Sequence, residues 1–374
     1  MKVVVAMSGG VDSSVCAALL KRQGFQVLGV FMKLYSPKEV GENLCCNLEA
    51  LYQAKRVADQ LEIPFYTINL AKEFKAFVFE RYLKEYAQGR TPNPCINCNR
   101  LIKFGFLLQK AKAMGADYLA TGHYVRLCES LEPDSTLRLI ALKAAPQSKR
   151  RFHLLTAKDR LKDQSYFLWT LTQEQLQHLL FPIGEYTKGE VRLLAQKWRL
   201  PTAQRPESQG LCFVGEGTNR ALLHRYLKPQ PGPIKDLKGR ILGQHEGLCF
   251  YTIGQREGLL INPKTPQSHP WYVAKIDYPN NTLWVGHQKD VFQKEVKLEG
   301  VNWINQPAAK AQLKARVRYG QPLVGCRLKE QTGETVTVEF SEPIWAVTPG
   351  QSLAFYQSLK EGGEELLGGG LITP

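Results

Sequence analysis

Three cysteines in two distant segments are the residues best suited to covalent chemistry. Cys95 and Cys98 form a Cys-x-x-Cys pair in the loop Thr91–Asn99, whose two prolines restrict the backbone and so fix the position of the thiols. Cys212 follows much later in the chain. Because the thiolate is the nucleophilic form of cysteine, a basic neighbour such as Arg100 favours reactivity in the first segment.

Three interpretations of these thiols follow from the residues alone. Cys98 and Cys212 could form a redox pair during sulfur transfer. Together with Cys95 they could instead hold an iron–sulfur cluster with one open iron position. A structural zinc site on Cys95 and Cys98 would need a second spaced pair, and Cys45 and Cys46 are adjacent rather than spaced, which disfavours zinc.

The sequence SGGVDSS at Ser8–Ser14 predicts a phosphate-binding loop between a buried strand and a helix. Its two glycines allow a sharp turn and close approach to an anion, and the free amides at the helix start supply donors. The loop lacks the lysine of a Walker A motif, which favours attack on an α-phosphate with release of pyrophosphate over transfer of a γ-phosphate. Asp12 is a candidate partner for Mg²⁺.

The elements that position these residues alternate between strand and helix in the first half of the chain. Apolar, β-branched runs predict strands, and apolar residues at helical spacing predict helices. The predicted strands are Lys2–Met7, Gln26–Met32, Phe65–Leu70, Tyr118–Thr121 and Leu137–Leu142, and the predicted helices are Ser13–Gln23, Leu48–Leu61, Lys72–Tyr86 and Arg100–Met114. This order predicts an α/β fold with a Rossmann-like parallel sheet, in which ligands bind beyond the carboxyl ends of the strands.

The second half of the chain is typical of β-structure. Prolines and glycines become frequent after about Phe213, and short strand-like segments alternate with turns. We predict a catalytic domain over 1–213, a small β-rich domain over 214–291 and a C-terminal β-barrel over 292–374. The remaining predicted elements are helices at Gln173–Leu180 and Lys188–Trp198 and a basic, exposed excursion at 144–160.

The composition indicates an intracellular protein that meets a polyanion. Lys and Arg number 49 against 34 Asp and Glu, a net charge of +15, and basic surfaces favour nucleic acid because they displace counterions from phosphates. The nine cysteines are odd in number and follow no export signal, which disfavours a disulfide framework. No apolar run is long enough to cross a bilayer. We therefore expect cytoplasmic localisation and no membrane association.

Long motifs occur in a fixed order along the chain. They are Ser8–Ser14, Gly89–Phe104, Ala120–Tyr124, Lys162–Leu168, Leu180–Gly184, Glu207–Gly215, Thr252–Leu259, Pro270–Val273 and Val347–Gln351. In this order they resemble one family, the tRNA-specific 2-thiouridylases (MnmA or TrmU), which are PP-loop ATP pyrophosphatases. The resemblance covers nearly the whole chain, and several motifs in order are far more specific than any single one.

The resemblance implies a tRNA-uridine 2-sulfurtransferase. Such an enzyme uses ATP to adenylate the wobble uridine of tRNAs of the Lys, Glu and Gln type and replaces its 2-oxygen with sulfur. Cys212 would receive the sulfur as a persulfide from a sulfur-donor protein, and Cys98 would be the nucleophile that later pairs with Cys212 in a disulfide. A variant of the same reaction would use a [4Fe-4S] cluster on Cys95, Cys98 and Cys212.

The resemblance also implies the binding residues. ATP, with Mg²⁺, would be bound by Ala6, Met7, Ser8, Gly9, Gly10, Val11, Asp12, Ser13, Met32 and Gly122. The target base would face Asn93, Pro94 and Cys95, and further tRNA contacts would come from His123, Lys162, Asp163, Gln164, Arg318, Tyr319 and Gln351. No metal site on the protein is expected apart from the Mg²⁺ that accompanies the nucleotide.

Two positions depart from the family pattern. Cys95 stands where many members have Asp, which weakens an acid or base role there and strengthens the cluster interpretation. Glu257 reverses a charge in the Thr252–Leu259 motif. Two other classes remain open from the residues: an ATP-dependent amidating synthetase, which uses a similar loop, and an RNA-binding module without catalysis, which would not need the loop.

Overall fold

The computed structural model describes most of the chain. The described residues are 1–35, 48–131, 138–139, 150–207, 210–214, 219–261, 269–308, 311–332, 334–359 and 362–374. Several positions named above lie outside these ranges: Cys45, Cys46, Ser208, Gln209, Gly215 and all of the predicted strand Leu137–Leu142 except Arg138 and Leu139.

A five-stranded parallel sheet forms the N-terminal part of the molecule, in the order β3-β2-β1-β4-β8. The strands are β1 (Lys2–Ala6), β2 (Gln26–Lys33), β3 (Phe65–Asn69), β4 (Tyr118–Ala120) and β8 (Leu179–Leu180). Strand β1 is central because its run of valines is fully buried, and a strand covered on both faces needs apolar residues in succession. The predicted α/β fold with a parallel sheet is confirmed.

Helices cover both faces of this sheet. On one face lie α1 (Val11–Arg22), α3 (Leu48–Gln60) and α9 (Lys188–Lys197), which share an apolar core with β1 and β2. On the other face, a continuous helix packs against Val4 and Leu28. That helix consists of α6 (Pro94–Asn97), the π-helical segment η2 (Cys98–Leu107) and α7 (Leu108–Ala113).

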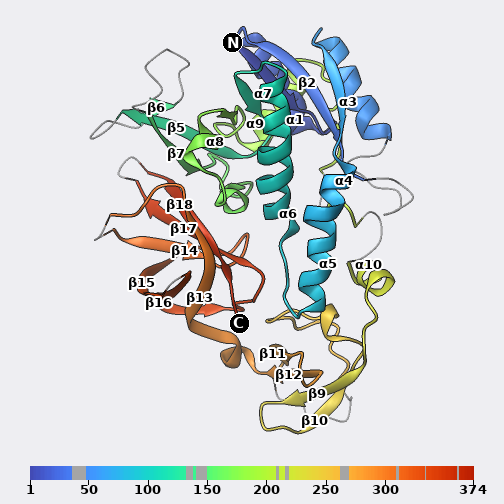
Figure 1. The fold of residues 1–374 in the computed structure, drawn as a ribbon, viewed down its shortest axis with the longest axis vertical. Helices are drawn as coiled ribbons and strands as arrows, with labels where there is room; N and C mark the ends of the chain where they lie inside the picture. The colour runs from blue at the N-terminus through green and yellow to red at the C-terminus, as the bar shows by residue number, and fades with distance from the viewer. Residues whose placement is uncertain are drawn as a thin grey trace.

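A second continuous helix runs beside it and is built in the same way. It consists of α4 (Ala71–Phe74), the π-helical segment η1 (Lys75–Phe79) and α5 (Glu80–Ala87). In Figure 1 both helices extend from the parallel sheet toward the C-terminal half. The cysteine loop, residues 88–93, joins the two helices. Cys95 and Cys98 themselves lie on the helix formed by α6, η2 and α7, so the predicted loop over Thr91–Asn99 is wrong after Asn93.

A small four-stranded sheet follows α10 (Asn219–Tyr226), in the order β10-β9-β12-β11. The strands are β9 (Gly232–Asp236), β10 (Ile241–His245), β11 (Tyr272–Asp277) and β12 (Thr282–Gly286). Its small core contains Ile234, Val273, Leu283 and Val285.

The C-terminal strands close into a six-stranded barrel, as predicted. Their order is β13-β16-β15-β14-β17-β18, and β18 pairs with β13 to complete the ring. The strands are β13 (Phe292–Trp303), β14 (Leu313–Arg316), β15 (Val324–Thr332), β16 (Thr335–Trp345), β17 (Ser352–Ser358) and β18 (Glu364–Ile372). Closure removes the unpaired edges that an open sheet would expose.

Two sequence predictions are wrong. The described part of the basic segment 144–160 contains strand β7 (Arg150–Thr156), which pairs with β5 (Val125–Leu131) and β18, with β6 (Arg138–Leu139) at the edge. Phe152, Leu154 and Leu155 of β7 are apolar and buried. Arg150 is neutralised by Glu129 at 3.2 Å, so the basic residues concealed a strand.

The second error is the helix expected at Gln173–Leu180. The helix α8 (Gln173–Leu176) is a short turn capped by Thr172, and the apolar pair that follows it becomes the edge strand β8. The short apolar run could not be assigned by periodicity alone, since a buried strand and a buried helix look alike over so few residues.

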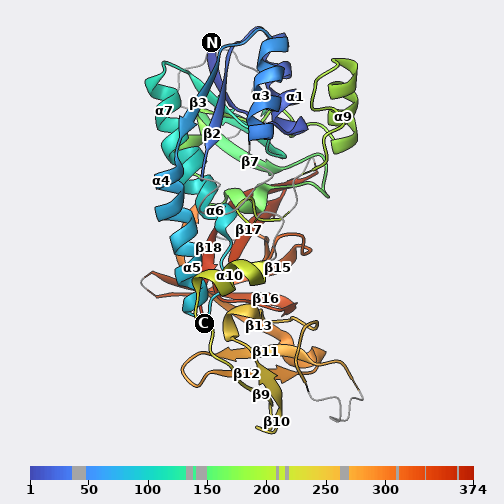
Figure 2. The same cartoon turned by 90° about the vertical axis from the view of Figure 1, so that its right-hand side faces the viewer.

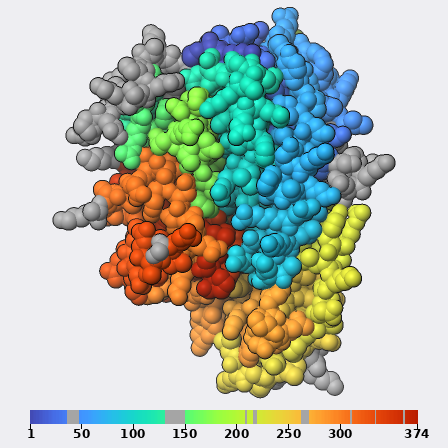
Figure 3. Space-filling view, in the orientation of Figure 1, coloured from blue at the N-terminus to red at the C-terminus, as the bar shows by residue number. Residues whose placement is uncertain are grey.

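The parallel sheet, the small sheet and the barrel are arranged around the two long helices. Figures 1 and 2 place the parallel sheet at one end, the small sheet at the other, and the barrel at the side of the two long helices. The space-filling view in Figure 3 shows the barrel in contact with these helices along its length. Within the described residues, no helix is both long and apolar enough to cross a membrane.

Candidate active site

The phosphate loop connects β1 to α1 at the carboxyl edge of the parallel sheet. The Ser13 hydroxyl accepts from the Ser8 amide at 3.2 Å and donates to the Gly10 carbonyl at 3.1 Å. Ser14 donates to the same carbonyl at 2.9 Å. These bonds hold the loop in a tight turn at the start of α1, where backbone amides and the helix dipole favour an anion.

Two glycines allow other parts of the chain to pack closely against this turn. Gly9 has φ +75°, and a Cβ there would lie 2.3 Å from the carbonyl oxygen of Ala50 on α3. Gly122 follows β4, and its Cβ would lie 2.9 Å from backbone atoms of Asp12 and Ser13. The chain after β4 therefore packs directly against the first turn of α1, which places Gly122 beside the loop.

Asp12 is bound by groups from distant segments. Lys188, the first residue of α9, donates to both carboxylate oxygens at 2.7 and 2.8 Å, and the Tyr124 hydroxyl donates to Oδ1 at 2.8 Å. Burial, and then the charge of Asp12, raises the pKa of Tyr124, so its hydroxyl remains a donor. Glu207 extends this network, since its carboxylate lies 2.8 Å from Lys162 Nζ and 3.6 Å from Lys188 Nζ.

Sequence reasoning missed these partners of the loop. Lys188 has no distinguishing motif among the 49 basic residues, and only the fold brings it to Asp12. Arg205, which donates to the Gly9 carbonyl at 2.8 Å, was missed for the same reason. Tyr124 and Glu207 stand inside motifs that the sequence did single out, and this was a signal that could have found them.

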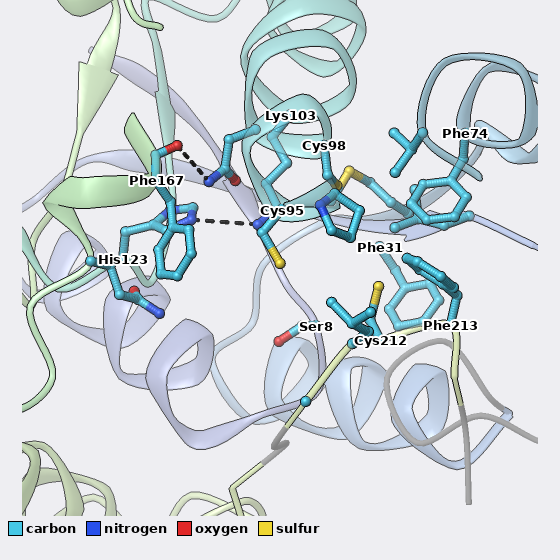
Figure 4. Close-up of a pocket in the computed structure, with 18 of the residues that line it drawn as sticks. Ser8, Phe31, Phe74, Cys95, Cys98, Lys103, His123, Phe167, Cys212 and Phe213 are labelled. Atoms are coloured by element: carbon cyan, nitrogen blue, oxygen red, sulfur yellow. Dashed lines mark hydrogen bonds between the residues drawn. The ribbon is translucent and has the colours of Figure 1, made fainter. Parts of the chain in front are cut away.

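A pocket of about 260 Å³ opens beside the loop (Figure 4). Met7 and Ser8 line it from the end of β1 and the start of the phosphate loop. Cys95 and Cys98 line it from the helix formed by α6, η2 and α7, which we call the cysteine helix, and Cys212 lines it from the segment that follows Gly210. In Figure 4 the side chains of Cys95 and Cys212 project toward the same space, above Ser8. The structure thus brings the three predicted thiols to one pocket at the phosphate loop. Other lining residues are Phe31, Met32, Asn99, Lys103, His123, Gln164 and Phe167.

The cysteine helix begins at a defined position. The Asn93 side chain accepts from the Cys95 amide at 3.1 Å, and Pro94 occupies the first turn, where its missing N–H costs nothing. Cys95 is half-buried, and Cys98, at 8% exposure, begins the π-helical segment η2. π-Helical turns often occur at functional sites because they redirect side chains within a helix.

The segment that carries Cys212 is anchored immediately after the cysteine. Phe213 is buried, with its ring 5.9 Å from Phe74 and 5.1 Å from Tyr82 in edge-to-face contacts. The Cys212 carbonyl accepts from the Tyr35 hydroxyl at 2.7 Å. These contacts hold the half-buried Cys212 against the pocket.

The other described cysteines are suited to packing. Burial raises the pKa of Cys16 and of Cys249, and it raises the pKa of Cys326 to about 12. Each thiol is therefore held in its unreactive, protonated form at neutral pH.

No metal-binding constellation is present among the described residues: no group of three or more His, Cys, Asp or Glu side chains is arranged to hold an ion. Cys95, Cys98 and Cys212 share a pocket but do not form a ligand set in this conformation. The iron–sulfur interpretation stays a prediction.

His123 is a neutral residue of the pocket wall. Its Nδ1 lies 2.7 Å from the Thr121 hydroxyl, and its Nε2 lies 3.4 Å from Lys103 Nζ. Burial, and then Lys103, lowers the pKa of His123 well below its usual value. Because the ammonium can only donate, Nε2 is the acceptor and Nδ1 carries the proton. His123 thus offers no positive charge to RNA at neutral pH.

The predicted tRNA-contacting segment 162–164 divides into outward and inward residues. Lys162 is partly exposed and pairs with Glu207. Asp163, at 3% exposure, accepts from the Ala157 amide at 3.0 Å and the Ser165 hydroxyl at 2.8 Å, so it holds the loop together from inside. Gln164 lines the pocket, and its Oε1 accepts from the Tyr124 amide at 3.0 Å.

The predicted contacts on the barrel lie beside the cysteine loop. Tyr319 packs on Phe167 with ring centroids 4.6 Å apart, and Arg318 donates to the Thr348 hydroxyl at 2.8 Å. Gln351, at 9% exposure, donates to the Thr91 carbonyl at 2.7 Å. The barrel thus holds the loop that precedes Cys95, and the RNA contacts themselves stay predictions.

The sheet, the loop and the strand order define a PP-loop nucleotide-binding fold followed by two β-domains. Three family models match successive parts of the chain: "tRNA methyl transferase HUP domain" at residues 1–216, "tRNA methyl transferase PRC-barrel domain" at 220–287 and "Aminomethyltransferase beta-barrel domain" at 293–372. A solved structure described as a 4-thiouridine synthetase–RNA complex with bound ATP is 16% identical, covers 60% of this chain and 49% of that chain, and has a TM-score of 0.35, too low to carry an argument.

Full-length relatives narrow the assignment. The "tRNA-specific 2-thiouridylase MnmA 1" of Caldanaerobacter subterraneus subsp. tengcongensis is 44% identical over 99% of this chain and 97% of its own. The "tRNA-specific 2-thiouridylase MnmA" of Roseiflexus sp. is 45% identical over 100% and 99%, and that of Thermus thermophilus is 43% identical over 99% and 94%. The chain belongs to the tRNA-specific 2-thiouridylase family.

Proposed function

We propose that this protein uses ATP to adenylate the 2-oxygen of the wobble uridine in tRNA and then replaces that oxygen with sulfur carried on Cys212. The observation that carries the proposal is the pocket in which the phosphate loop meets Cys98 and Cys212. A phosphate loop alone would suit many ATP-dependent enzymes, and two thiols alone would suit a redox protein. Their meeting at one pocket suits an activated substrate that receives sulfur.

The first step is activation of a poor leaving group. The uridine 2-oxygen attacks the α-phosphorus of ATP, the bond to the β-phosphate oxygen breaks, and pyrophosphate leaves. The backbone amides in the first turn of α1 and the positive end of this helix stabilise the negative charge that develops on the phosphates. A loop of this kind fixes the nucleotide without a general base, because catalysis of phosphoryl transfer is largely a matter of position and charge.

Uracil suits the chemistry of the pocket wall. Asn99 is buried; its amide nitrogen donates to the Phe167 carbonyl at 3.3 Å, and its Oδ1 has no hydrogen-bond partner among the described residues. Since a carbonyl can only accept, the amide cannot be turned round. The N3–H of a uracil is a donor that would match this acceptor, and the Phe167 ring offers a stacking surface.

The second step transfers sulfur. The terminal sulfur of a Cys212 persulfide attacks carbon 2, and AMP leaves with the former 2-oxygen. The Cys98 thiolate then attacks Cys212 Sγ, the bond from Sγ to the transferred sulfur breaks, and the electron pair stays on the new 2-thio group. A Cys98–Cys212 disulfide remains, which a thiol reductant must return to two thiols with two electrons.

Two cofactors were expected besides ATP. Mg²⁺ prefers oxygen ligands and commonly binds one carboxylate together with substrate phosphates, and Asp12 at the loop fits this role. When bound, the ion would neutralise charge on the departing pyrophosphate. The alternative form of the proposal keeps the same reaction with a [4Fe-4S] cluster, which Cys95, Cys98 and Cys212 would hold.

The remaining parts of the proposal concern partners. The substrate is tRNA, and the net charge of +15 supports binding to a polyanion. The persulfide sulfur comes from a donor protein of a persulfide relay, and we place the enzyme in the cytoplasm with its substrate. The individual tRNA contacts predicted at His123, Lys162, Asp163, Gln164, Arg318, Tyr319 and Gln351 belong to this proposal.

Reconstituted thiolation tests the proposal. Wild-type protein is given tRNA, ATP, Mg²⁺ and a persulfide donor, and pyrophosphate release and 2-thiouridine are both measured. We expect Cys212→Ala to lose thiolation while it still binds tRNA and releases pyrophosphate, and Cys326→Ala to behave as wild type. Thiolation by Cys212→Ala at the wild-type rate would refute the sulfur-carrier role.

The same assay separates the other classes. An ATP-dependent amidating synthetase would release pyrophosphate with ammonia as co-substrate and leave no sulfur on the tRNA. An RNA-binding module without catalysis would bind tRNA and release no pyrophosphate. The iron–sulfur variant would show iron and inorganic sulfide in protein purified without oxygen, and its activity would be lost on chelation.

A further inference from the structure

The ion pair between Lys188 and Asp12 brings a cation to a phosphate loop that has none of its own. The loop sequence SGGVDSS contains no lysine or arginine. Lys188 comes from α9, and its Nζ binds both oxygens of Asp12, in the first turn of α1. Polyphosphate sites usually need a cationic side chain near the β- and γ-phosphates in addition to backbone amides.

We propose that Lys188 is the phosphate-binding cation of the nucleotide site, a role that rests on the proposed use of ATP. In this structure its ammonium is held by Asp12. With Mg²⁺ and ATP present, Asp12 becomes a ligand for the ion and Lys188 binds the phosphates. The exchange keeps the local charge balanced, because Asp12 exchanges the Lys188 ammonium for Mg²⁺ and Lys188 exchanges the Asp12 carboxylate for the phosphates.

The surroundings of Lys188 favour such an exchange. Lys188 is 9% exposed, and its ammonium lies 5.7 Å from the centre of the Tyr124 ring, so its stem is held in place while its tip stays polar. Tyr124 also donates to Asp12 Oδ1 at 2.8 Å, which gives this carboxylate a second partner besides Lys188. Glu207, at 3.6 Å from Nζ, is a second carboxylate within reach and is also neutralised by Lys162.

A second basic residue near the loop, Arg205, contacts the loop backbone. Arg205 donates to the Gly9 carbonyl at 2.8 Å and lies 4.0 Å from the Glu49 carboxylate, so it supports the shape of the turn. Lys188 differs because its partner is a carboxylate that is itself suited to Mg²⁺. This difference assigns the phosphate role to Lys188 and a positioning role to Arg205.

Binding of separate parts of the nucleotide tests this assignment. The affinities for Mg²⁺·ATP, for Mg²⁺·pyrophosphate and for adenosine are measured by calorimetry on wild type, Lys188→Met and Lys188→Arg. We expect Lys188→Met to lower the affinity for ATP and for pyrophosphate about 10- to 100-fold, the range for loss of a charged hydrogen bond. The affinity for adenosine should not change. Lys188→Arg should recover part of the loss.

Two controls keep the result decisive. Lys158→Met removes an exposed lysine that pairs with Glu190, which lies on α9 as Lys188 does. This variant should bind all three ligands like wild type. If Lys188→Met alone is unstable, the double variant Asp12→Asn, Lys188→Met replaces it, because both members of the ion pair are then neutral. The double variant should still bind pyrophosphate weakly and adenosine normally.

Equal affinity of Lys188→Met and wild type for pyrophosphate would overturn the assignment, as would an equal loss for adenosine, which would indicate a purely structural ion pair. Failure of the proposed function is a different result: wild-type protein itself would then bind no ATP or release no pyrophosphate with tRNA.

Discussion

At the scale of single residues, neutral His123 makes stability depend on pH. Its pKa in the folded protein lies below the ordinary value of about 6.5 because of burial and Lys103, so the unfolded chain binds a proton that the folded protein does not. Its contribution to stability is complete above about pH 6.5 and is lost as the pH falls from there toward the folded pKa.

We therefore expect His123→Gln to flatten the loss of unfolding free energy on acidification, by up to about 1.4 kcal/mol per pH unit in that interval. Urea unfolding at pH 5, 6 and 8 measures the effect. His178→Gln is the matched control, because that ring is only half-buried. An unchanged pH slope in His123→Gln would mean that folding does not lower the pKa of His123.

At the scale of elements, the contact between the end of β4 and the start of α1 shapes the nucleotide site. A methyl group at Gly122 would lie 2.9 Å from backbone atoms of Asp12 and Ser13, which cannot rotate away as a side chain would. We expect Gly122→Ala to displace the first turn of α1, raise the KM for ATP about 10-fold and destabilise the protein by about 1–3 kcal/mol, the usual cost of overpacking.

A second glycine in the same part of the molecule supplies the control for Gly122→Ala. Gly189 is exposed on α9, and a Cβ there would meet only Thr187 Oγ1 at 3.9 Å. Gly189→Ala should leave the KM for ATP unchanged and stabilise the helix by up to about 1 kcal/mol. Steady-state kinetics measures the KM for ATP of both variants, and thermal unfolding measures their stability. A normal KM in Gly122→Ala would show that the loop tolerates displacement.

At the scale of the whole molecule, the barrel holds the cysteine loop. The Thr91 amide donates to the Pro349 carbonyl at 2.9 Å, and Gln351 donates to the Thr91 carbonyl at 2.7 Å. We expect Gln351→Ala to lower kcat for thiolation about 10-fold, because the loop that precedes Cys95 and Cys98 loses one support. Its effect on tRNA affinity should be smaller, because only one of the proposed tRNA contacts is removed.

Gln321→Ala is the control for this prediction, since Gln321 donates to the Trp345 carbonyl and its bond stays within the barrel. Filter binding with tRNA and single-turnover thiolation measure the two quantities. A large loss of tRNA affinity with unchanged single-turnover rate would instead support the direct tRNA contact predicted for Gln351 from the sequence.

The barrel also completes the catalytic part of the fold. Strand β7 pairs with β18 through Leu154 and Leu366, both fully buried. We expect a fragment of residues 1–291 to aggregate, because this edge of β7 and its apolar surface would be uncovered. Size-exclusion chromatography and circular dichroism check this outcome. A monomeric fragment with cooperative unfolding would show that the predicted boundary at 291/292 separates independent folding units.

The sequence by itself determined the local features. Glycines and serines in Ser8–Ser14 specify a tight turn, and the valines of β1 specify a strand buried on both faces. These features depend on neighbours in the chain, so residue type and spacing were enough. They included the phosphate loop and the three thiols of the candidate site.

Only the tertiary structure decided which distant residues meet. The pairing of Lys188 with Asp12, the support of Thr91 by Gln351 and the addition of β7 to the barrel sheet join segments far apart in sequence. Such contacts depend on how sheets and helices pack, and a lysine or glutamine carries no local signal of its eventual partner. The chemistry of the site was therefore visible in the sequence, and its assembly into one pocket was a property of the fold.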